Sequence, residues 1–288
     1  MKVLLLLLLP TMSTAQNIFA GKIVNKKNGS IVPFATVALL KENIGTNAND
    51  RGEFNLESFK NYTDTISISC VGFQTSKVAL SNIPLDNRFE LEAISLTLQS
   101  VIIGRSFSKT SNVLNEFSNC GNSSFTTSGF VTQMAQHFYS PCSSSILSEI
   151  NICKTGDNAK FRIRVYNIDS ITKAPSLDLL DTVLEVTSKG RHVNIKVEKY
   201  RILLPHKDFF IAVEWLKIPY NKRETSSKSN GVRKDYIHYS PSISFKKNKN
   251  GTVNSDTQSK IWMKTYTGIW SRLDQSVDFF LISTKVKY

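Results

Sequence analysis

Short apolar runs separated by turn residues follow one another through the first third of the chain. Each run fits a β-strand, and the runs cover residues 18–24, 34–40, 52–56, 65–71, 74–80 and 89–98. Turn signals separate them at residues 26–29 (Lys-Lys-Asn-Gly) and 49–52 (Asn-Asp-Arg-Gly). No window of a dozen residues shows helical periodicity. Short strands at close spacing predict a β-sandwich over residues 17–103.

Alternation of apolar and polar residues marks the later part of the chain. It is clearest at residues 161–166, 192–198 and 209–215, and two further strands are expected at 261–266 and 279–286. This period of two is typical of half-buried antiparallel strands. We therefore expect a second, jelly-roll-like antiparallel β-sandwich over residues 126–288. Residues 104–125 are rich in Ser, Asn and Thr and predict a linker between the two sandwiches.

The first residues have the pattern of an export signal. Met1 and Lys2 precede the apolar run 3–9, Pro10 ends the run, and small residues lead to Ala15. A membrane anchor would need about 20 apolar residues, which is far more than this run holds. We expect a signal peptide over residues 1–15. The mature chain is then exported, to the periplasm, to the outer membrane as an associated protein, or to the medium.

Four motifs of the first sandwich resemble a known domain. They are residues 21–24 (GKIV), 32–37 (VPFATV), 45–54 (GTNANDRGEF) and 66–73 (ISISCVGF). Together they resemble the carboxypeptidase regulatory-like domain, a transthyretin-like (prealbumin-like) sandwich. This module is found beside metallocarboxypeptidases and before the plug of TonB-dependent receptors of Bacteroidetes-type bacteria. The resemblance implies a fold and a cell-envelope setting but no particular function.

Residues of the second half are similar to the C-terminal region of stand-alone, exported proteins that carry the same regulatory-like domain. The similar stretches are residues 161–169, 174–180 and 209–216. Those proteins are mostly uncharacterised, so this likeness supports the architecture and adds nothing about activity.

Catalytic motifs are absent from the sequence. None of the four histidines is followed by Glu three residues later, and there is no HExxH, GxSxG or phosphate-binding loop. No CxxC or His/Cys cluster has the spacing of a zinc site either. We therefore expect no enzymatic activity, no catalytic residue, no cofactor and no metal site.

A candidate binding surface lies near the C-terminus. Trp262, Tyr266 and Trp270 follow one another at four-residue spacing among Lys264 and Arg272. Aromatic rings beside polar loops can stack on the apolar C–H faces of sugars. We call these five residues the aromatic strip and predict that it binds a glycan. The alternative is that Trp262 and Trp270 fill the second core.

Charge is distributed unevenly along the chain. The formal net charge is +13, and residues 201–288 hold 16 of the basic residues against 7 acidic ones. A solvated basic surface explains this excess, and so does contact of the C-terminal region with an anionic membrane surface or an acidic glycan. Nucleic acid is not expected as a partner because no motif for it accompanies the basic residues.

The four cysteines allow one disulfide after export. Cys70 alternates onto the same face as Ile66 and Ile68, which predicts a buried free thiol. Among the other three, we expect Cys142 to pair with Cys153, because the short run between them could turn back on itself.

Two function classes remain open. The first is a non-catalytic exported cell-envelope protein that binds a ligand or partner, namely a glycan, a peptide or an envelope protein. The alternative is a secreted hydrolase with its site at a loop end of the second sandwich.

Overall fold

The structure is a computed structural model that describes residues 18–57, 63–94, 110–229, 232–247, 261–273 and 277–288. The expected signal peptide, residues 1–15, lies outside the described residues. Those residues form 23 strands and three single-turn 3₁₀ helices and contain no α-helix. No helix in the described ranges could cross a bilayer, since none has the length and apolar character needed.

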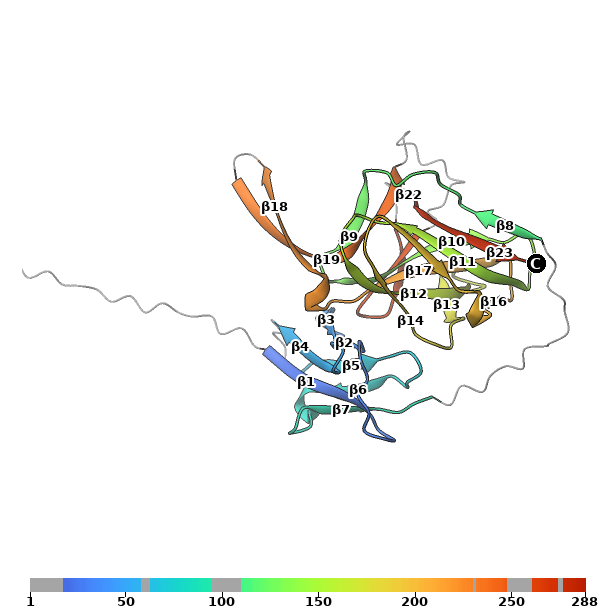
Figure 1. The fold of residues 1–288 in the computed structure, drawn as a ribbon. Helices are drawn as coiled ribbons and strands as arrows, with labels where there is room; N and C mark the ends of the chain where they lie inside the picture. The colour runs from blue at the N-terminus through green and yellow to red at the C-terminus, as the bar shows by residue number, and fades with distance from the viewer. Residues whose placement is uncertain (1–17, 58–62, 95–109, 230–231, 248–260, 274–276) are drawn as a thin grey trace, which may run out of the picture.

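Two sheets form the N-terminal sandwich (Figure 1). The first has the strand order β4 (Glu53–Glu57), β1 (Ile18–Asn25), β7 (Arg88–Leu91), with β1 and β7 parallel. The second has the order β3 (Ile44–Asn47), β2 (Thr36–Leu39), β5 (Thr65–Ser69), β6 (Ser76–Ala79), and a 3₁₀ turn, Leu80–Asn82, follows it. Alternate residues of β4 and β5 are buried, as their sequence pattern predicts. They fill one apolar core between the sheets.

Both predicted turns are present. At the first, Gly29 donates its backbone N–H to the carbonyl of Asn25 over 2.8 Å. At the second, the side-chain oxygen of Asn49 accepts the N–H groups of Arg51 and Glu53, and Gly52 follows with φ of +74°. A side chain at Gly52 would also meet the Ile23 carbonyl, so this turn requires glycine.

The second half of the chain is built from three antiparallel sheets. The large sheet consists of β10 (Val131–Tyr139), β12 (Ala159–Ile168), β13 (Pro175–Asp178), β14 (Leu184–Ser188), β17 (Asp208–Trp215), β20 (Ile261–Thr265) and β21 (Trp270–Arg272). The facing sheet consists of β8 (Ser111–Leu114), β11 (Ser145–Cys153), β15 (His192–Lys196), β16 (Leu203–Leu204) and β23 (Ile282–Lys287). The third consists of β9 (Ser124–Thr127), β18 (Lys222–Ser229), β19 (Val232–Lys247) and β22 (Val277–Phe280). The 3₁₀ turns Glu198–Tyr200 and Pro219–Asn221 lie between strands.

The large and facing sheets pack on each other. Phe161, Ile163 and Val165 of β12 meet Ile150 and Ile152 of β11 in one apolar core. Consecutive strands pass from one sheet to the other, for example β10 to β11 to β12. The prediction of an all-β chain with two sandwiches is confirmed.

Part of the stretch predicted as a linker belongs to the second sandwich. Within residues 104–125, β8 pairs with β23 at the edge of the facing sheet, and β9 begins at Ser124. Asn115 also donates its side-chain amide to the carbonyl of Ile282 over 2.6 Å. A strand at a sheet edge is held by backbone hydrogen bonds and needs few apolar side chains. A Ser/Asn-rich stretch can therefore form such a strand without showing the apolar pattern of one. The corrected second sandwich begins near Ser111.

The prediction of the disulfide was wrong for one of its two cysteines. Cys153 is bonded to Cys120, with Cα atoms 5.4 Å apart, whereas Cys142 is a free thiol. Residues 145–153 do not turn back but form the straight strand β11, which spans roughly 26 Å at the rise of a β-strand. A disulfide requires Cα atoms within about 7 Å, so Cys142 cannot reach Cys153. Cys70 is free and half-buried, close to the prediction.

A long hairpin projects from the second sandwich (Figure 1). It consists of β18 and the first half of β19, paired from Lys222 and Tyr239 out to Ser229 and Val232. We call residues 222–229 and 232–239 the arm hairpin. Its residues Tyr236 and Ile237 are 49% and 47% exposed, so the arm hairpin presents side chains to solvent on both faces.

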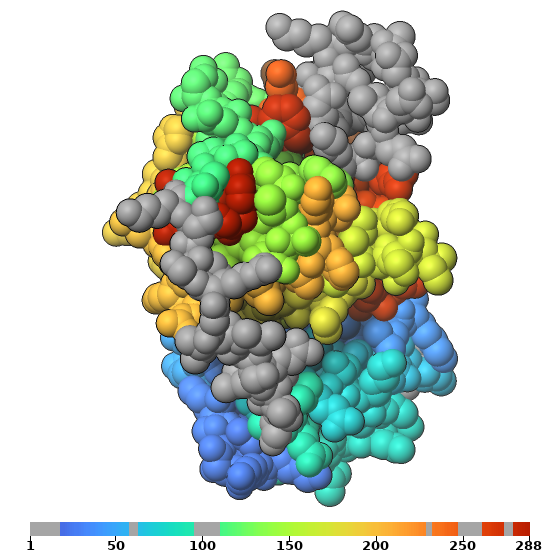
Figure 2. All heavy atoms as spheres, turned by 90° about the vertical axis from the view of Figure 1, so that its right-hand side faces the viewer, coloured from blue at the N-terminus to red at the C-terminus, as the bar shows by residue number. Residues whose placement is uncertain are grey.

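The N-terminal sandwich packs against the second half of the chain (Figure 2), and it contacts the outer face of the large sheet, the face turned away from the second core. Phe34, whose φ is +55°, packs its ring against Leu216 and Ile218. Backbone contacts fix the register of the docking. Asn47 Oδ1 accepts the N–H of Lys217 over 2.7 Å, and the Lys217 ammonium donates to the Gly45 carbonyl over 2.8 Å.

Gly45 allows the closest approach of the two sandwiches. A methyl group at this position would lie 2.4 Å from the ring of Tyr266 and 2.5 Å from the carbonyl of Val37. Since Tyr266 is itself buried, it has no free space to move into. The absence of a side chain at Gly45 is therefore a condition of the observed docking.

We expect Gly45→Ala to lower the free energy of unfolding by about 1–3 kcal/mol, because overpacking of a filled contact costs this much. The matched control is Gly156→Ala, whose new methyl group meets no atom within 4 Å. Chemical denaturation of both variants measures the difference. Equal stability of the two variants would contradict the described docking.

Cys120→Ser removes the disulfide, whose two cysteines are 33 residues apart in sequence. The loss of a cross-link closing a loop of this length is expected to cost about 3–4 kcal/mol. Cys142→Ser is the control and should change stability much less. Non-reducing peptide mapping gives a second reading, and a linked peptide containing Cys142 would overturn the assignment.

Candidate functional site

The outer face of the large sheet carries a row of charged and polar side chains. Because alternate residues of a strand point to opposite faces, Arg162 and Arg164 of β12 lie opposite the core side of that strand. Register aligns Arg162 with Glu214 of β17, Glu214 with Gln133 of β10, and Gln133 with Lys264 of β20. Four adjacent strands thus place two cations, a carboxylate and an amide side by side.

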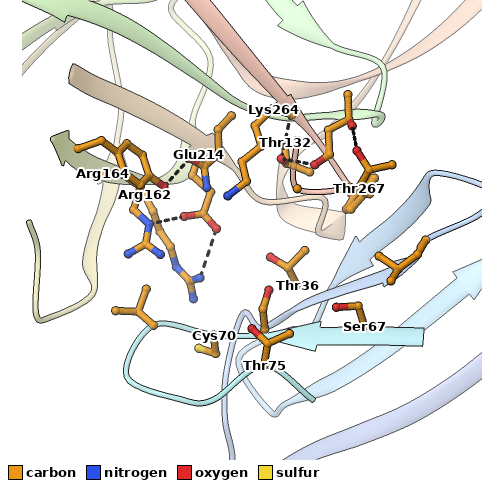
Figure 3. Close-up of a pocket in the computed structure, with 18 of the residues that line it drawn as sticks. Thr36, Ser67, Cys70, Thr75, Thr132, Arg162, Arg164, Glu214, Lys264 and Thr267 are labelled. Carbon is orange, nitrogen blue, oxygen red and sulfur yellow. Dashed lines mark hydrogen bonds and ion pairs between the residues drawn. The ribbon is translucent and has the colours of Figure 1, made fainter. Parts of the chain in front are cut away.

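A cavity of about 430 Å³ lies between this row and the N-terminal sandwich. Arg162, Arg164, Glu214 and Lys264 enter it from the large sheet (Figure 3). Small polar groups face them from the N-terminal sandwich, which contributes Thr36, Ser67, Ser69, Cys70, Thr75 and Lys77. The volume falls in the range of about 300–1,000 Å³ that is usual for small-ligand sites.

Glu214 holds the two arginines by ion pairs. Its oxygens lie 3.7 Å from Nη1 of Arg162 and 2.9 Å from Nε of Arg164. Arg164 also reaches Asp178, with 3.1 Å between Nη1 and Oδ2. The side chains of Arg162 and Glu214 are only 3% and 7% exposed. These charges are therefore removed from water by the covering sandwich.

Hydrogen bonding at these groups is incomplete. Arg162 Nε, Arg164 Nε and Nη1, and Glu214 Oε2 are buried, and none makes a hydrogen bond. The short contact of Arg164 with Glu214 is close enough for an ion pair but is not aligned for N–H donation. Arg162 makes one long hydrogen bond, to the Pro33 carbonyl over 3.4 Å. Buried polar atoms in native proteins usually have partners, so the guanidinium groups retain unused donor capacity.

Lys264 adds a third cation on this face. Within the described part of the chain, its ammonium makes no hydrogen bond or ion pair and lies 5.5 Å from the centre of the Trp270 ring. Burial lowers the pKa of Lys264, although Glu214 acts in the opposite direction. Burial likewise raises the pKa of Asp178, against the effect of Arg164. Both directions are expected where water is largely excluded.

Tyr166 closes one side of the row. Its hydroxyl donates to the side-chain carbonyl of Gln133 over 2.8 Å, and its ring meets the edge of Trp270 at 5.5 Å between centroids. Burial raises the pKa of Tyr166, so the phenol stays protonated and remains a donor. These contacts connect the cavity to the hairpin of β20 and β21.

Four residues of the aromatic strip come together on that hairpin. Trp262 pairs with Arg272 and Lys264 pairs with Trp270 across the two strands. The Arg272 guanidinium lies 5.0 Å from the centre of the Trp262 ring. Trp262 and Trp270 are half-buried, so neither core nor surface describes them fully. Tyr266 is apart from the others, because it is buried against Gly45.

The strongest charges of the cavity were not among the predicted site residues. Arg162, Arg164 and Glu214 were recognised in the sequence only as the polar members of alternating strands. One signal was available in the sequence: Glu214 is the single charge in the apolar run 209–216. An acidic residue in such a run, opposite a strand with two arginines, indicates a buried ion pair.

Two histidines make other polar clusters away from the cavity. His137 Nε2 lies 2.7 Å from Asp208 Oδ1 on neighbouring strands. His192 lies beside the Cys120–Cys153 disulfide, and the three form the one group of possible metal ligands among the described residues. Because the two sulfurs are bonded to each other, neither is a free thiolate, and this group does not fit a metal ion as it stands.

Comparisons with known proteins identify one part of the chain. No curated protein sequence matches it. Among solved structures, the cysteine protease and lectin-like domains of Cwp84, a surface layer associated protein of Clostridium difficile, are 11% identical, with a TM-score of 0.35. The match covers 55% of this chain and 32% of that one, and a likeness this loose carries no argument.

A family model gives the firmer result. Residues 19–103 match the CarboxypepD_reg-like domain, in agreement with the boundaries and the β-sandwich of the N-terminal unit. The N-terminal sandwich of this chain is therefore a member of the carboxypeptidase regulatory-like domain family.

Proposed function

We propose that this protein is a non-catalytic, exported binding protein of the cell envelope, and that its ligand occupies the cavity between the two sandwiches. The observation that carries the proposal is the buried guanidinium group of Arg162 on that cavity, whose Nε makes neither a hydrogen bond nor an ion pair among the described residues. Polar atoms removed from water without partners are costly, and a polar ligand would supply the missing acceptors.

The residues around the cavity suit binding better than catalysis. No histidine is among the residues that line it. Cys70 is the one thiol there, and burial raises its pKa, which disfavours the nucleophilic thiolate. The carboxylate of Glu214 is already ion-paired with two arginines. These features favour a site that orients a ligand without transforming it.

A secreted hydrolase remains the alternative. The pair formed by His137 and Asp208 is the observation that favours it, since a carboxylate can orient an imidazole as a general base. The pair stacks on Phe210 and lies outside the cavity. Hydrolysis that is lost in His137→Ala and kept in Lys264→Gln would support this alternative.

Export is supported by two features. Residues 1–15 have the signal-peptide pattern, and a disulfide persists in oxidising compartments outside the cytosol. In the envelope, the arm hairpin could meet an anionic membrane surface through the exposed residues Lys228, Arg233 and Lys234. The cavity would then be held near the membrane while it binds its ligand.

Glycans are the ligand class that we place first. The cavity is rich in hydroxyl groups, and the half-buried ring of Trp270, which does not line it, packs against the lining residues Tyr166 and Lys264. Sugars combine hydroxyl groups with apolar C–H faces, and such walls match both properties. Peptides and other envelope proteins are the remaining candidates for the same cavity.

Titration of the mature protein with envelope polysaccharide fragments, followed by tryptophan fluorescence, tests this proposal. Only three tryptophans are present, and Trp215 is fixed in the core by a hydrogen bond to the Pro241 carbonyl. We therefore expect a saturable signal from Trp262 and Trp270. Trp270→Ala should weaken binding by about tenfold, as expected for the loss of an aromatic contact and its neighbours.

Ser67→Phe provides the test of location. It narrows the cavity from the N-terminal sandwich without touching the charged row, and it should abolish binding. Thr225→Phe on the exposed arm hairpin is the matched control and should bind normally. Equal binding by the two variants would place the ligand outside the cavity, and a flat response to every fragment would refute a glycan as the ligand.

A further inference from the structure

The charge of the cavity walls is strongly unbalanced. Lys77, Arg162, Arg164 and Lys264 line it together with one carboxylate, Glu214. Asp178 compensates part of the charge of Arg164 from the neighbouring strand β13. The remaining positive charge lies in a partly buried space, in which Arg162 is buried and Lys77 is exposed. A group entering such a space is selected for negative charge, because electrostatic attraction is stronger there than in water.

Two of these cations have donors to offer a ligand. The ammonium of Lys264 makes no hydrogen bond or ion pair in the described part of the chain, and it points into the cavity (Figure 3). Arg162 is 97% buried by side-chain area, yet its Nε has no acceptor and its ion pair to Glu214 spans 3.7 Å. A carboxylate accepts several charge-assisted hydrogen bonds and would satisfy donors of both residues.

The opposite wall has a different chemistry. Hydroxyl groups dominate it, from Thr36, Ser67, Ser69 and Thr75, and Thr132, Thr265 and Thr267 continue the pattern on the large sheet. Each hydroxyl both donates and accepts, as the hydroxyl groups of a sugar ring do. The cavity therefore presents most of its cations from the large sheet and hydroxyl groups from both walls.

Peptide recognition by strand addition does not fit this geometry. The strands that supply the cations from the large sheet, β12, β17 and β20, are each paired on both sides. On the other wall, β2 and β5 are also paired on both sides. The backbone groups of these five strands are used within the sheets, so on these strands only side chains remain to hold a ligand. The edge strand β6, which contributes Lys77, is paired only with β5 among the described residues.

We infer that the cavity binds the carboxylate of an acidic sugar residue, with Lys264 and Arg162 as its cationic receptors and the hydroxyl-bearing wall facing the sugar ring. This inference rests on the proposed binding function and specifies its ligand. Burial lowers the pKa of Lys264, and a bound carboxylate would act against this shift because it stabilises the charged ammonium.

Matched pairs of oligosaccharides test the inference by calorimetry. The probes are trimers of galacturonic, glucuronic and mannuronic acid and a sialic acid trimer, each measured beside its derivative in which the carboxyl groups are reduced to alcohols. The expected result is that at least one acidic trimer binds about tenfold or more tightly than its reduced form, the usual effect of a charge-assisted hydrogen bond.

Variants locate the carboxylate. Lys264→Gln should remove most of the preference for the acidic trimer, whereas Lys264→Arg should retain it. Lys77→Gln changes an exposed residue that lines the cavity. It should reduce the preference for the acidic trimer without affecting folding. Lys234→Gln on the arm hairpin has the same charge change at an exposed site outside the cavity and should have no effect. A denaturation curve for each variant shows that it is folded.

Each other outcome overturns the inference. Equal binding of acidic and reduced trimers, or binding of neutral glycans only, would refute it and leave the binding function intact. A hexaglutamate peptide that binds through Lys264 while no acidic sugar does would assign the cavity to acidic peptides instead. No binding by any glycan or peptide would refute the inference and leave an envelope protein as the remaining ligand of the proposed function.

Discussion

The ion-paired row formed by Arg162, Glu214 and Arg164 is the feature on which the arrangement of the molecule depends. These side chains lie on the face of the large sheet that points away from its core, where solvent would normally solvate them. Here the N-terminal sandwich covers them, so the charges are buried between two domains. Removing an ion from water costs several kcal/mol, and mutual attraction offsets this cost only when geometry and hydrogen bonding are good. The cavity, its charge and its unused donors all follow from this covering.

Contacts beside the cavity hold the cover in place. Phe34 packs against Leu216 and Ile218, Lys217 binds the backbone and side chain of β3, and Gly45 admits the ring of Tyr266. These contacts border the charged row, since Tyr266 lines the cavity and the Phe34 ring lies 5.8 Å from the Arg162 guanidinium. The apolar part of the docking thus provides attraction, and the adjacent polar part is left open enough to hold a ligand. A binding cleft at the junction of two domains is a common consequence of such an arrangement.

Sequence patterns predicted the parts of the fold that local periodicity determines. Strands β12, β15 and β17 alternate clearly, so their positions were predicted. β17 is nevertheless buried on both faces, because Phe210 and Ala212 pack in a second apolar cluster. The arm hairpin was not predicted, because β18 is rich in Ser and Lys and is stabilised by backbone pairing with β19. The disulfide partner of Cys153 was missed for a similar reason. It depends on where β11 ends relative to a distant loop, and no local pattern records that distance.

The site shows the same division. Trp262, Lys264, Trp270 and Arg272 are close in sequence, and their meeting on one hairpin was foreseeable. The cavity required the docking of two sandwiches, which sequence periodicity does not describe. An interface selected for stability alone would hold apolar side chains at Arg162, Glu214 and Arg164, since such replacements of buried ion pairs are often neutral or stabilising. Local features that lower stability without an evident structural gain concentrate at functional sites. The retention of charge and of unpaired donors at this junction therefore favours a binding role over a purely structural one.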